Sequence, residues 1–75
     1  MNTFEKIRDI IVEQLGIEND DVKLETNFRD DLKADSLDLF QIINDIEEAF
    51  DISIENVEEI STVGQAVEYV EKNKK

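Results

Sequence analysis

Apolar residues recur every three or four positions in three separate stretches of this chain, and this spacing constrains the fold more than any other feature. The residues that follow the pattern are Phe4, Ile7, Ile11 and Leu15, then Leu39, Ile42, Ile43, Ile46, Ala49 and Phe50, then Val63, Ala66, Val67 and Val70. Such spacing places side chains on one face of an α-helix. We therefore predict helices at residues 3–15, 35–51 and from 62 onward, each with a buried face, and Tyr69 at the margin of the last one.

Residues that cap helices stand at the ends of these stretches. Asn2 and Asp35 each precede a stretch and have an acid three residues later, which is the spacing of an N-cap and N3. Thr62 and Gln65 form a capping box, and Gly16 occupies the position where a left-handed residue ends a helix. The caps support the same three helices.

The segments between the helices lack a sustained period. Residues 17–35 carry scattered apolar residues that indicate a long loop pinned across the core: Ile17, Val22, Leu24, Phe28 and Leu32. Residues 52–60 are short and β-branched, with room for one helical turn around 56–60. With 75 residues and no proline, the chain predicts an all-α fold. We expect a single domain over residues 1–75, a bundle of three main helices plus one short helix, with the long loop between the first two.

Missing residue types exclude most catalytic chemistry. The chain has no cysteine and no histidine, so it lacks a disulfide, a thiolate, the main zinc ligands and a Ser-His or Cys-His pair. It also lacks a glycine-rich phosphate loop and an EF-hand loop. We expect no catalytic residue and no metal site, and therefore a protein that is not an enzyme.

The charge is strongly negative and unevenly placed. The net charge is −12, and residues 34–71 hold eleven acids and no base. This surface repels nucleic acids and anionic membranes and favours basic protein partners. No apolar run reaches the length of a membrane span, and the first residues lack the layout of a signal peptide. We expect a cytoplasmic protein that binds neither nucleic acid nor membrane.

Two large apolar residues fall on the acidic face of the second predicted helix. At about 100° per residue, Leu37 and Phe40 lie away from the buried stripe. Their neighbours on that face are polar or acidic: Gln41, Asn44, Glu47 and Glu48. One interpretation is that the long loop covers both apolar side chains. The other is a docking surface with an apolar centre and a charged rim.

Ser36 stands at the start of the same helix. Unpaired backbone N–H groups and the helix dipole favour an anion at this position, so a phosphate ester on Ser36 fits, although Asp35 and Asp38 oppose it. The alternative is that the D-S-x-D sequence is an ordinary helix cap. The residues alone leave both interpretations open.

The run D-L-K-A-D-S-L-D at residues 31–38 resembles the acyl carrier protein signature, D-L-G-A-D-S-L-D. The resemblance extends to Phe28 and Leu32 before the run, to I-E-E-A-F at residues 46–50, and to T-V-x-x-A-V-x-Y-V near the end. It implies that Ser36 accepts 4′-phosphopantetheine from coenzyme A through a phosphopantetheinyl transferase. Acyl groups would then ride on the arm as thioesters.

The resemblance also implies how partners bind. Basic patches of acyl-transferring and chain-elongating enzymes would dock beside the serine, on Asp35, Asp38, Glu47 and Glu48, with Leu37 as the apolar contact. The carrier would be a monomer, and its bundle could open to shelter an acyl chain.

Departures from the family pattern keep alternatives open. Lys33 replaces a glycine, Phe40 a small β-branched residue, Gln41 a glutamate and Asn44 a methionine, and the segment before Thr62 is shorter than usual. A carrier for fatty-acid or related biosynthesis is one interpretation, and a specialised carrier for a polyketide or other dedicated pathway is another. A D-alanyl or peptidyl carrier fits less well. A competing class is an acidic helical interaction protein that carries nothing.

Overall fold

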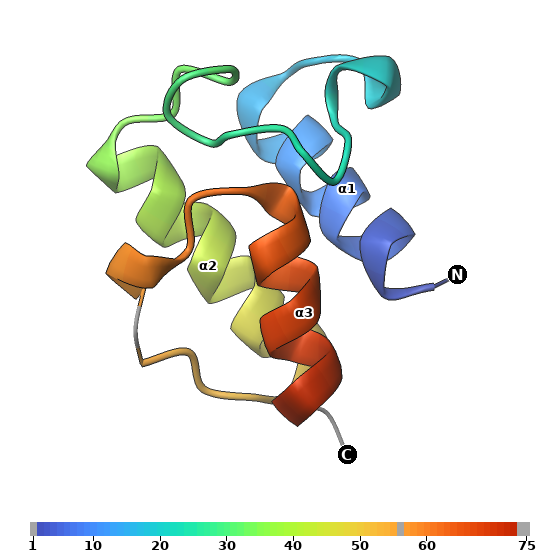
Figure 1. Ribbon diagram of the computed structural model, residues 1–75, viewed down its shortest axis with the longest axis vertical. Helices are drawn as coiled ribbons and strands as arrows, with labels where there is room; N and C mark the ends of the chain where they lie inside the picture. The colour runs from blue at the N-terminus through green and yellow to red at the C-terminus, as the bar shows by residue number, and fades with distance from the viewer. Residues whose placement is uncertain (1, 56, 74–75) are drawn as a thin grey trace.

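The computed structural model describes residues 2–55 and 57–73, and its regular elements are all helical (Figure 1). In chain order they are α1 (Thr3–Leu15), the 3₁₀ turn η1 (Asn19–Asp21), α2 (Ser36–Phe50), the 3₁₀ turn η2 (Val57–Glu59) and α3 (Val63–Asn73). The predicted all-α bundle with a long loop before its second main helix is confirmed. The short helix expected around 56–60 is the turn η2, and Asn56 lies outside the described residues.

Capping side chains define where α1 and α3 begin. The Asn2 Oδ1 accepts a hydrogen bond from the Glu5 N–H at 2.8 Å. At α3, the Gln65 N–H donates to the Thr62 Oγ1 at 3.2 Å, and the Gln65 Oε1 accepts from the Thr62 N–H at 3.0 Å. These contacts satisfy N–H groups that have no partner inside the helix. The predicted N-cap at Asn2 and the predicted capping box at Thr62 are therefore confirmed.

Residues in the left-handed region end α1 and α2. Gly16 has φ 67°, and its N–H donates to the Val12 carbonyl at 2.8 Å, as the sequence predicts. Asp51 ends α2 with φ 55°, a conformation that costs energy for a residue with a Cβ. The C-terminus of α2 is therefore less favourable locally than that of α1.

The core forms where α1 packs against both α2 and α3. Its fully buried side chains come from all three helices and from the loop between α1 and α2: Phe28, Ile7, Ile11, Ile42, Ile46, Val63 and Val70. Two sequence expectations are wrong. Ala49 is exposed, because it lies at the edge of the apolar stripe of α2, and Leu24 is 54 % exposed in the loop.

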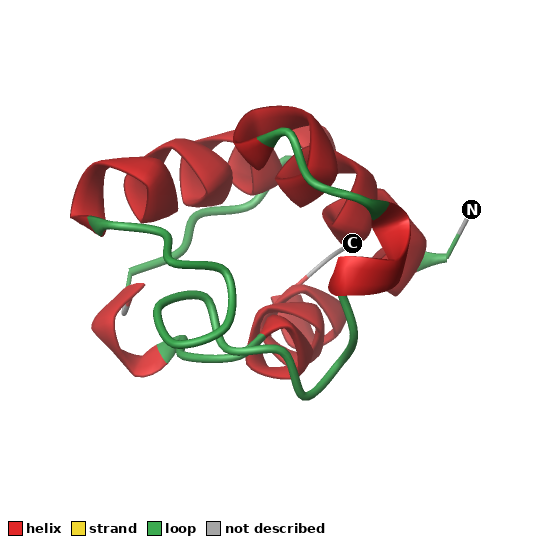
Figure 2. Cartoon of the chain, turned by 90° about the horizontal axis from the view of Figure 1, so that it is seen from above, coloured by secondary structure: helices red, strands yellow, loops and turns green. Residues whose placement is uncertain are grey.

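The first connection, residues 17–34, crosses the end of the bundle between α1 and α2 (Figures 1 and 2). Val22 and Phe28 anchor it in the core, so the predicted pinning of this loop is confirmed for these two residues. Backbone hydrogen bonds fasten it to the start of α3, from the Phe28 N–H to the Ser61 carbonyl at 2.9 Å and from the Val63 N–H to the Thr26 carbonyl at 2.9 Å.

Gly64 permits the closest of these approaches. Its N–H donates to the Leu24 carbonyl at 2.8 Å. A Cβ at this position would lie 2.9 Å from the same oxygen, which is too close for two such atoms. The first connection thus packs directly on the backbone of α3.

Candidate functional site at the start of helix α2

Ser36 is the first residue of α2, and it is exposed. Asp35 is the N-cap, and its Oδ1 accepts a hydrogen bond from the Asp38 N–H at 2.9 Å. The first turn of a helix carries N–H groups without intrahelical partners, and the helix dipole makes this end positive. The hydroxyl of Ser36 therefore lies in solvent, at a helix end that favours an anion.

The residues before Ser36 form a turn that is closed by its own polar side chains. The Asn27 Oδ1 accepts hydrogen bonds from the N–H groups of Arg29 and Asp30, both at 2.9 Å. The Ala34 N–H donates to the Phe28 carbonyl at 2.9 Å. Because Phe28 is fully buried, the turn is tied to the core two residues before the helix begins. This local structure fixes where Ser36 is presented.

Leu37 and Phe40 project from the first turns of α2 into solvent. Their side chains are 70 % and 59 % exposed, respectively. The prediction that both lie off the buried stripe is confirmed, and the alternative in which the long loop covers them is wrong. The first connection instead turns toward α3, to which it is hydrogen-bonded.

The polar residues that were predicted beside them share this side of α2. Asp35, Gln41, Asn44 and Glu48 are exposed, whereas Asp38 and Glu47 are half-buried. A surface groove of about 460 Å³ runs along the helix, lined by Phe40, Gln41, Ile43, Asn44, Glu47, Ile54 and Val57. Four of the predicted docking residues therefore line one groove, namely Phe40, Gln41, Asn44 and Glu47. Asp35, Leu37, Asp38 and Glu48 are not part of its lining.

Sequence reasoning missed the contribution of the segment after α2. A second groove of about 350 Å³ is lined by Phe40, Glu55, Val57, Glu58 and Glu59, so three further acids lie beside the Phe40 ring. The sequence shows these acids as part of a run without bases, but it does not show that they lie beside α2. A second contact was also missed, in which the Glu47 Oε2 accepts a hydrogen bond from the Ile54 N–H at 2.7 Å.

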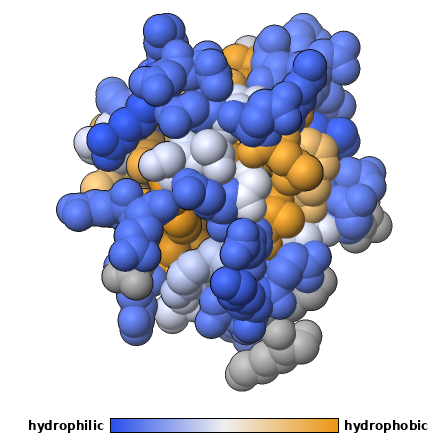
Figure 3. Space-filling view, in the orientation of Figure 1, coloured by the Kyte–Doolittle hydropathy of each residue, from blue (hydrophilic) through white to orange (hydrophobic). Residues whose placement is uncertain are grey.

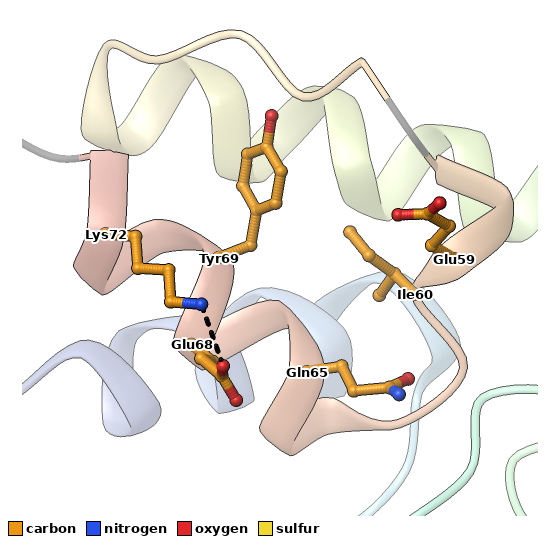
Figure 4. Close-up of a pocket in the computed structure, with 6 residues that line it drawn as sticks. All are labelled: Glu59, Ile60, Gln65, Glu68, Tyr69 and Lys72. Atoms are coloured by element: carbon orange, nitrogen blue, oxygen red, sulfur yellow. Dashed lines mark ion pairs between the residues drawn. The ribbon is translucent and has the colours of Figure 1, made fainter.

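A groove on the α3 side of η2 is shown in Figure 4, and it has a volume of about 230 Å³. Its Gln65 side-chain oxygen is used by the capping box, and its Lys72 Nζ lies 3.1 Å from the Glu68 Oε1. Several polar groups of this groove are thus already paired within the chain, including the Tyr69 hydroxyl, which donates to the Ser53 carbonyl at 3.3 Å. Figure 3 shows that hydrophilic side chains cover most of this face of the molecule, with apolar patches between them.

Comparison with known proteins agrees with this geometry. Residues 5–70 match the family model described as "Phosphopantetheine attachment site". The chain is 59 % identical to an acyl carrier protein of Streptococcus pyogenes serotype M1 over 75 residues, which is the full length of both chains. It is 55 % identical to an acyl carrier protein of Lactococcus lactis over 74 residues, covering 99 % of this chain and 100 % of the other.

The fold also matches a solved structure, that of an acyl carrier protein from Enterococcus faecalis. The two share a TM-score of 0.82 and 34 % sequence identity, with 99 % of this chain and 100 % of the other covered. Helical bundle, attachment-site family and full-length relatives define one class, the phosphopantetheine-dependent carriers. Within that class, the chain belongs to the acyl carrier protein family.

The structure fits the group that this family carries. Attachment of 4′-phosphopantetheine needs an accessible hydroxyl and space for a phosphate, and the exposed Ser36 provides both at the positive end of α2. When bound, the group supplies the thiol that the chain lacks, since the sequence contains no cysteine.

No helix among the described residues 2–55 and 57–73 is long and apolar enough to cross a membrane.

Proposed function

We propose that Ser36 is the residue that carries 4′-phosphopantetheine and that acyl intermediates of fatty-acid or related biosynthesis are held there as thioesters. The observation that carries this proposal is the exposed hydroxyl of Ser36 at the first residue of α2, inside the signature run. In the loading step, a bond forms between the Ser36 Oγ and the pantetheine phosphorus of coenzyme A. Adenosine 3′,5′-bisphosphate leaves, and the hydroxyl proton passes to a base of the transferase.

The chain acts as a carrier and leaves catalysis to its partners. These are a phosphopantetheinyl transferase and acyl-transferring and chain-elongating enzymes that have basic docking patches. The carrier works as a cytoplasmic monomer whose single domain spans residues 1–75. Its net charge of −12 supports fast, salt-sensitive encounters with basic partners.

Docking takes place on the exposed side of α2 beside Ser36. Leu37 and Phe40 supply an apolar centre, and polar and acidic residues supply the rim: Asp35, Asp38, Gln41, Asn44 and Glu48. A small apolar contact within a charged rim gives rapid association with modest affinity. Glu47 lies on the same side, but its carboxylate already accepts a hydrogen bond, so its part in docking differs from that of Glu48.

Intact mass after incubation with coenzyme A and a phosphopantetheinyl transferase tests the attachment site. The wild type should gain one 4′-phosphopantetheine, and Ser36→Ala should gain none, because no other hydroxyl lies at this helix start. Ser53→Ala and Ser61→Ala are matched controls, since both serines are exposed and lie outside the signature run. Labelling of Ser36→Ala would disprove the assignment.

A specialised carrier is the second candidate, and Phe40 favours it. A large ring that is 59 % exposed on the docking surface suits a dedicated set of partners. Mass spectrometry of the protein from its own host separates the candidates. A fatty acyl cargo supports the first, a different acyl cargo supports the second, and a chain that is always unmodified would count against both.

A further inference from the structure

Two adjacent acids of α2 have different surroundings. The half-buried Glu47 places its Oε2 2.7 Å from the N–H of Ile54, which is itself only 7 % exposed. Glu48 is exposed, and its carboxylate forms no hydrogen bond or ion pair with the described part of the chain. The sequence alone assigns one role to both residues, whereas the contacts separate them.

The segment that Glu47 contacts is also held from the other side. The Tyr69 hydroxyl donates to the Ser53 carbonyl at 3.3 Å and accepts from the Glu55 N–H at 3.5 Å. Figure 4 shows the Tyr69 ring extending from α3 toward the loop that follows α2. Side chains of α2 and α3 thus fix residues 53–55 between them, with Glu47 making the shortest contact.

The position of Ile54 shapes the groove along α2. Ile54 lines this groove together with Phe40, Ile43 and Val57, and it is also part of the core cluster. A hydrogen bond from an N–H to a carboxylate is stronger than one to a neutral acceptor. The Glu47 carboxylate therefore contributes to holding the wall formed by Ile54 against α2.

An ion pair with a partner's lysine or arginine has a different cost at each of the two acids. To pair fully with Glu47, it must compete with the Ile54 N–H, and a part-buried N–H that loses its acceptor is costly. Pairing with Glu48 breaks no contact that the described chain makes. The difference predicts that direct pairing with a partner's base relies on Glu48 more than on Glu47.

We propose that Glu47 is a positioning residue, which holds Ile54 and thereby shapes the groove along α2, and that Glu48 is the acid that pairs with basic partners. The inference rests on the proposed carrier function only for the role of Glu48. The role of Glu47 is a property of the free chain. Glu47 thus acts mainly through its acceptor oxygen, and Glu48 mainly through its negative charge.

Amide hydrogen exchange at Ile54, measured by NMR on the full unmodified chain, tests the positioning role. Glu47→Ala should speed exchange roughly tenfold, because a hydrogen bond to a charged acceptor is lost. Glu47→Gln should stay within about threefold of the wild type, since the amide oxygen is a neutral but competent acceptor. Glu48→Ala, the matched control, should leave Ile54 exchange unchanged. A Glu47→Ala chain that fails to fold but is rescued by Glu47→Gln supports the same role.

Loading by a phosphopantetheinyl transferase at low salt tests the docking role. Glu48→Ala should raise KM roughly two- to fivefold, the effect of one exposed charge pair, and added salt should reduce the difference. Glu47→Gln should raise KM less than Glu48→Ala does, because the lost charge contributes only to long-range attraction. Equal KM effects of Glu47→Gln and Glu48→Ala, together with unchanged Ile54 exchange in Glu47→Ala, would overturn the inference. Failure of the wild type to be loaded would instead refute the carrier function, and the exchange result would still decide the role of Glu47.

Discussion

The two irregular connections of this bundle are fastened in different ways. The first connection, residues 17–34, is joined to α3 by backbone hydrogen bonds and anchored by the fully buried Phe28. The second connection consists of the described residues 51–55 and 57–62. Its early part is held by the side chains of Glu47 and Tyr69 and by the burial of Ile54. One backbone hydrogen bond, from the Ile52 N–H to the Glu47 carbonyl at 3.1 Å, also joins it to α2.

The two connections also border different parts of α2. The first connection leads directly into Ser36, and backbone hydrogen bonds to residues 61–64 fix its path. The second connection forms one wall of the groove that holds Phe40. Because side-chain contacts hold this wall, substitutions at a few positions can change its shape without changing the fold.

Phe28→Ala should have the largest effect, since it removes the anchor of the first connection. A buried phenylalanine replaced by alanine costs about 3–5 kcal/mol, which is most of the free energy of unfolding of a small domain, about 5 kcal/mol. We expect the urea midpoint to fall close to zero, because only about 0–2 kcal/mol of unfolding free energy would remain. Leu24→Ala is the control from the same connection, because Leu24 is 54 % exposed, and it should change the free energy of unfolding little. Similar losses for both variants would mean that Phe28 is not the anchor.

Phe40→Ala should have a smaller effect on stability, of about 1 kcal/mol, because less than half of this side chain is covered. Helicity should persist by circular dichroism, and transfer to or from a partner enzyme should weaken. A loss of stability as large as that of Phe28→Ala would show that Phe40 is buried against the second connection as fully as Phe28 is buried in the first. The comparison between the connections would then fail.

Glycine substitutions at the two strained positions should have the smallest effects, and these should be stabilising. Lys33 in the first connection has φ 59° and Asp51 at the start of the second has φ 55°. Relief of a left-handed conformation is worth about 1–2 kcal/mol, from which the extra chain entropy of glycine subtracts about 0.5–1 kcal/mol.

Asp51→Gly should raise the melting temperature more than Lys33→Gly. It also removes a negative charge from the negative end of α2, whereas Lys33→Gly removes a base from an acidic surface. Thermal melts of the two variants at low salt measure the difference. A larger gain for Lys33→Gly would show that backbone strain is greater at Lys33 than at Asp51. The charge difference would then not decide which variant is more stable.

Local sequence predicted the helices well because their boundaries depend on neighbouring residues. Asn2, Gly16, Asp35 and Thr62 cap helices through contacts within a few residues of themselves. Predictions that required distant partners were less secure. The sequence places Leu24 in the core. In the structure its carbonyl accepts a hydrogen bond from the Gly64 N–H, while its side chain is 54 % exposed.

The candidate site divides in the same way. The position of Ser36 at a helix start and the outward direction of Leu37 and Phe40 follow from helix periodicity, which the sequence contains. The different surroundings of Glu47 and Glu48 do not follow from it. They depend on Ile54, seven residues after Glu47 and beyond the end of the helix, and on Tyr69 in α3.

Residue type and local spacing were enough to predict the three helices, the acidic surface, the attachment signature and the outward direction of Leu37 and Phe40. That no loop covers these two side chains is a result of the tertiary structure. Tertiary structure decided which loop residues are anchors, where the second connection lies and which acids remain available to a partner. These outcomes require backbone groups far apart in the chain to meet, such as Phe28 with Ser61 and Val63 with Thr26. Only the packed bundle specifies such meetings, since a buried N–H takes whichever acceptor the fold brings to it.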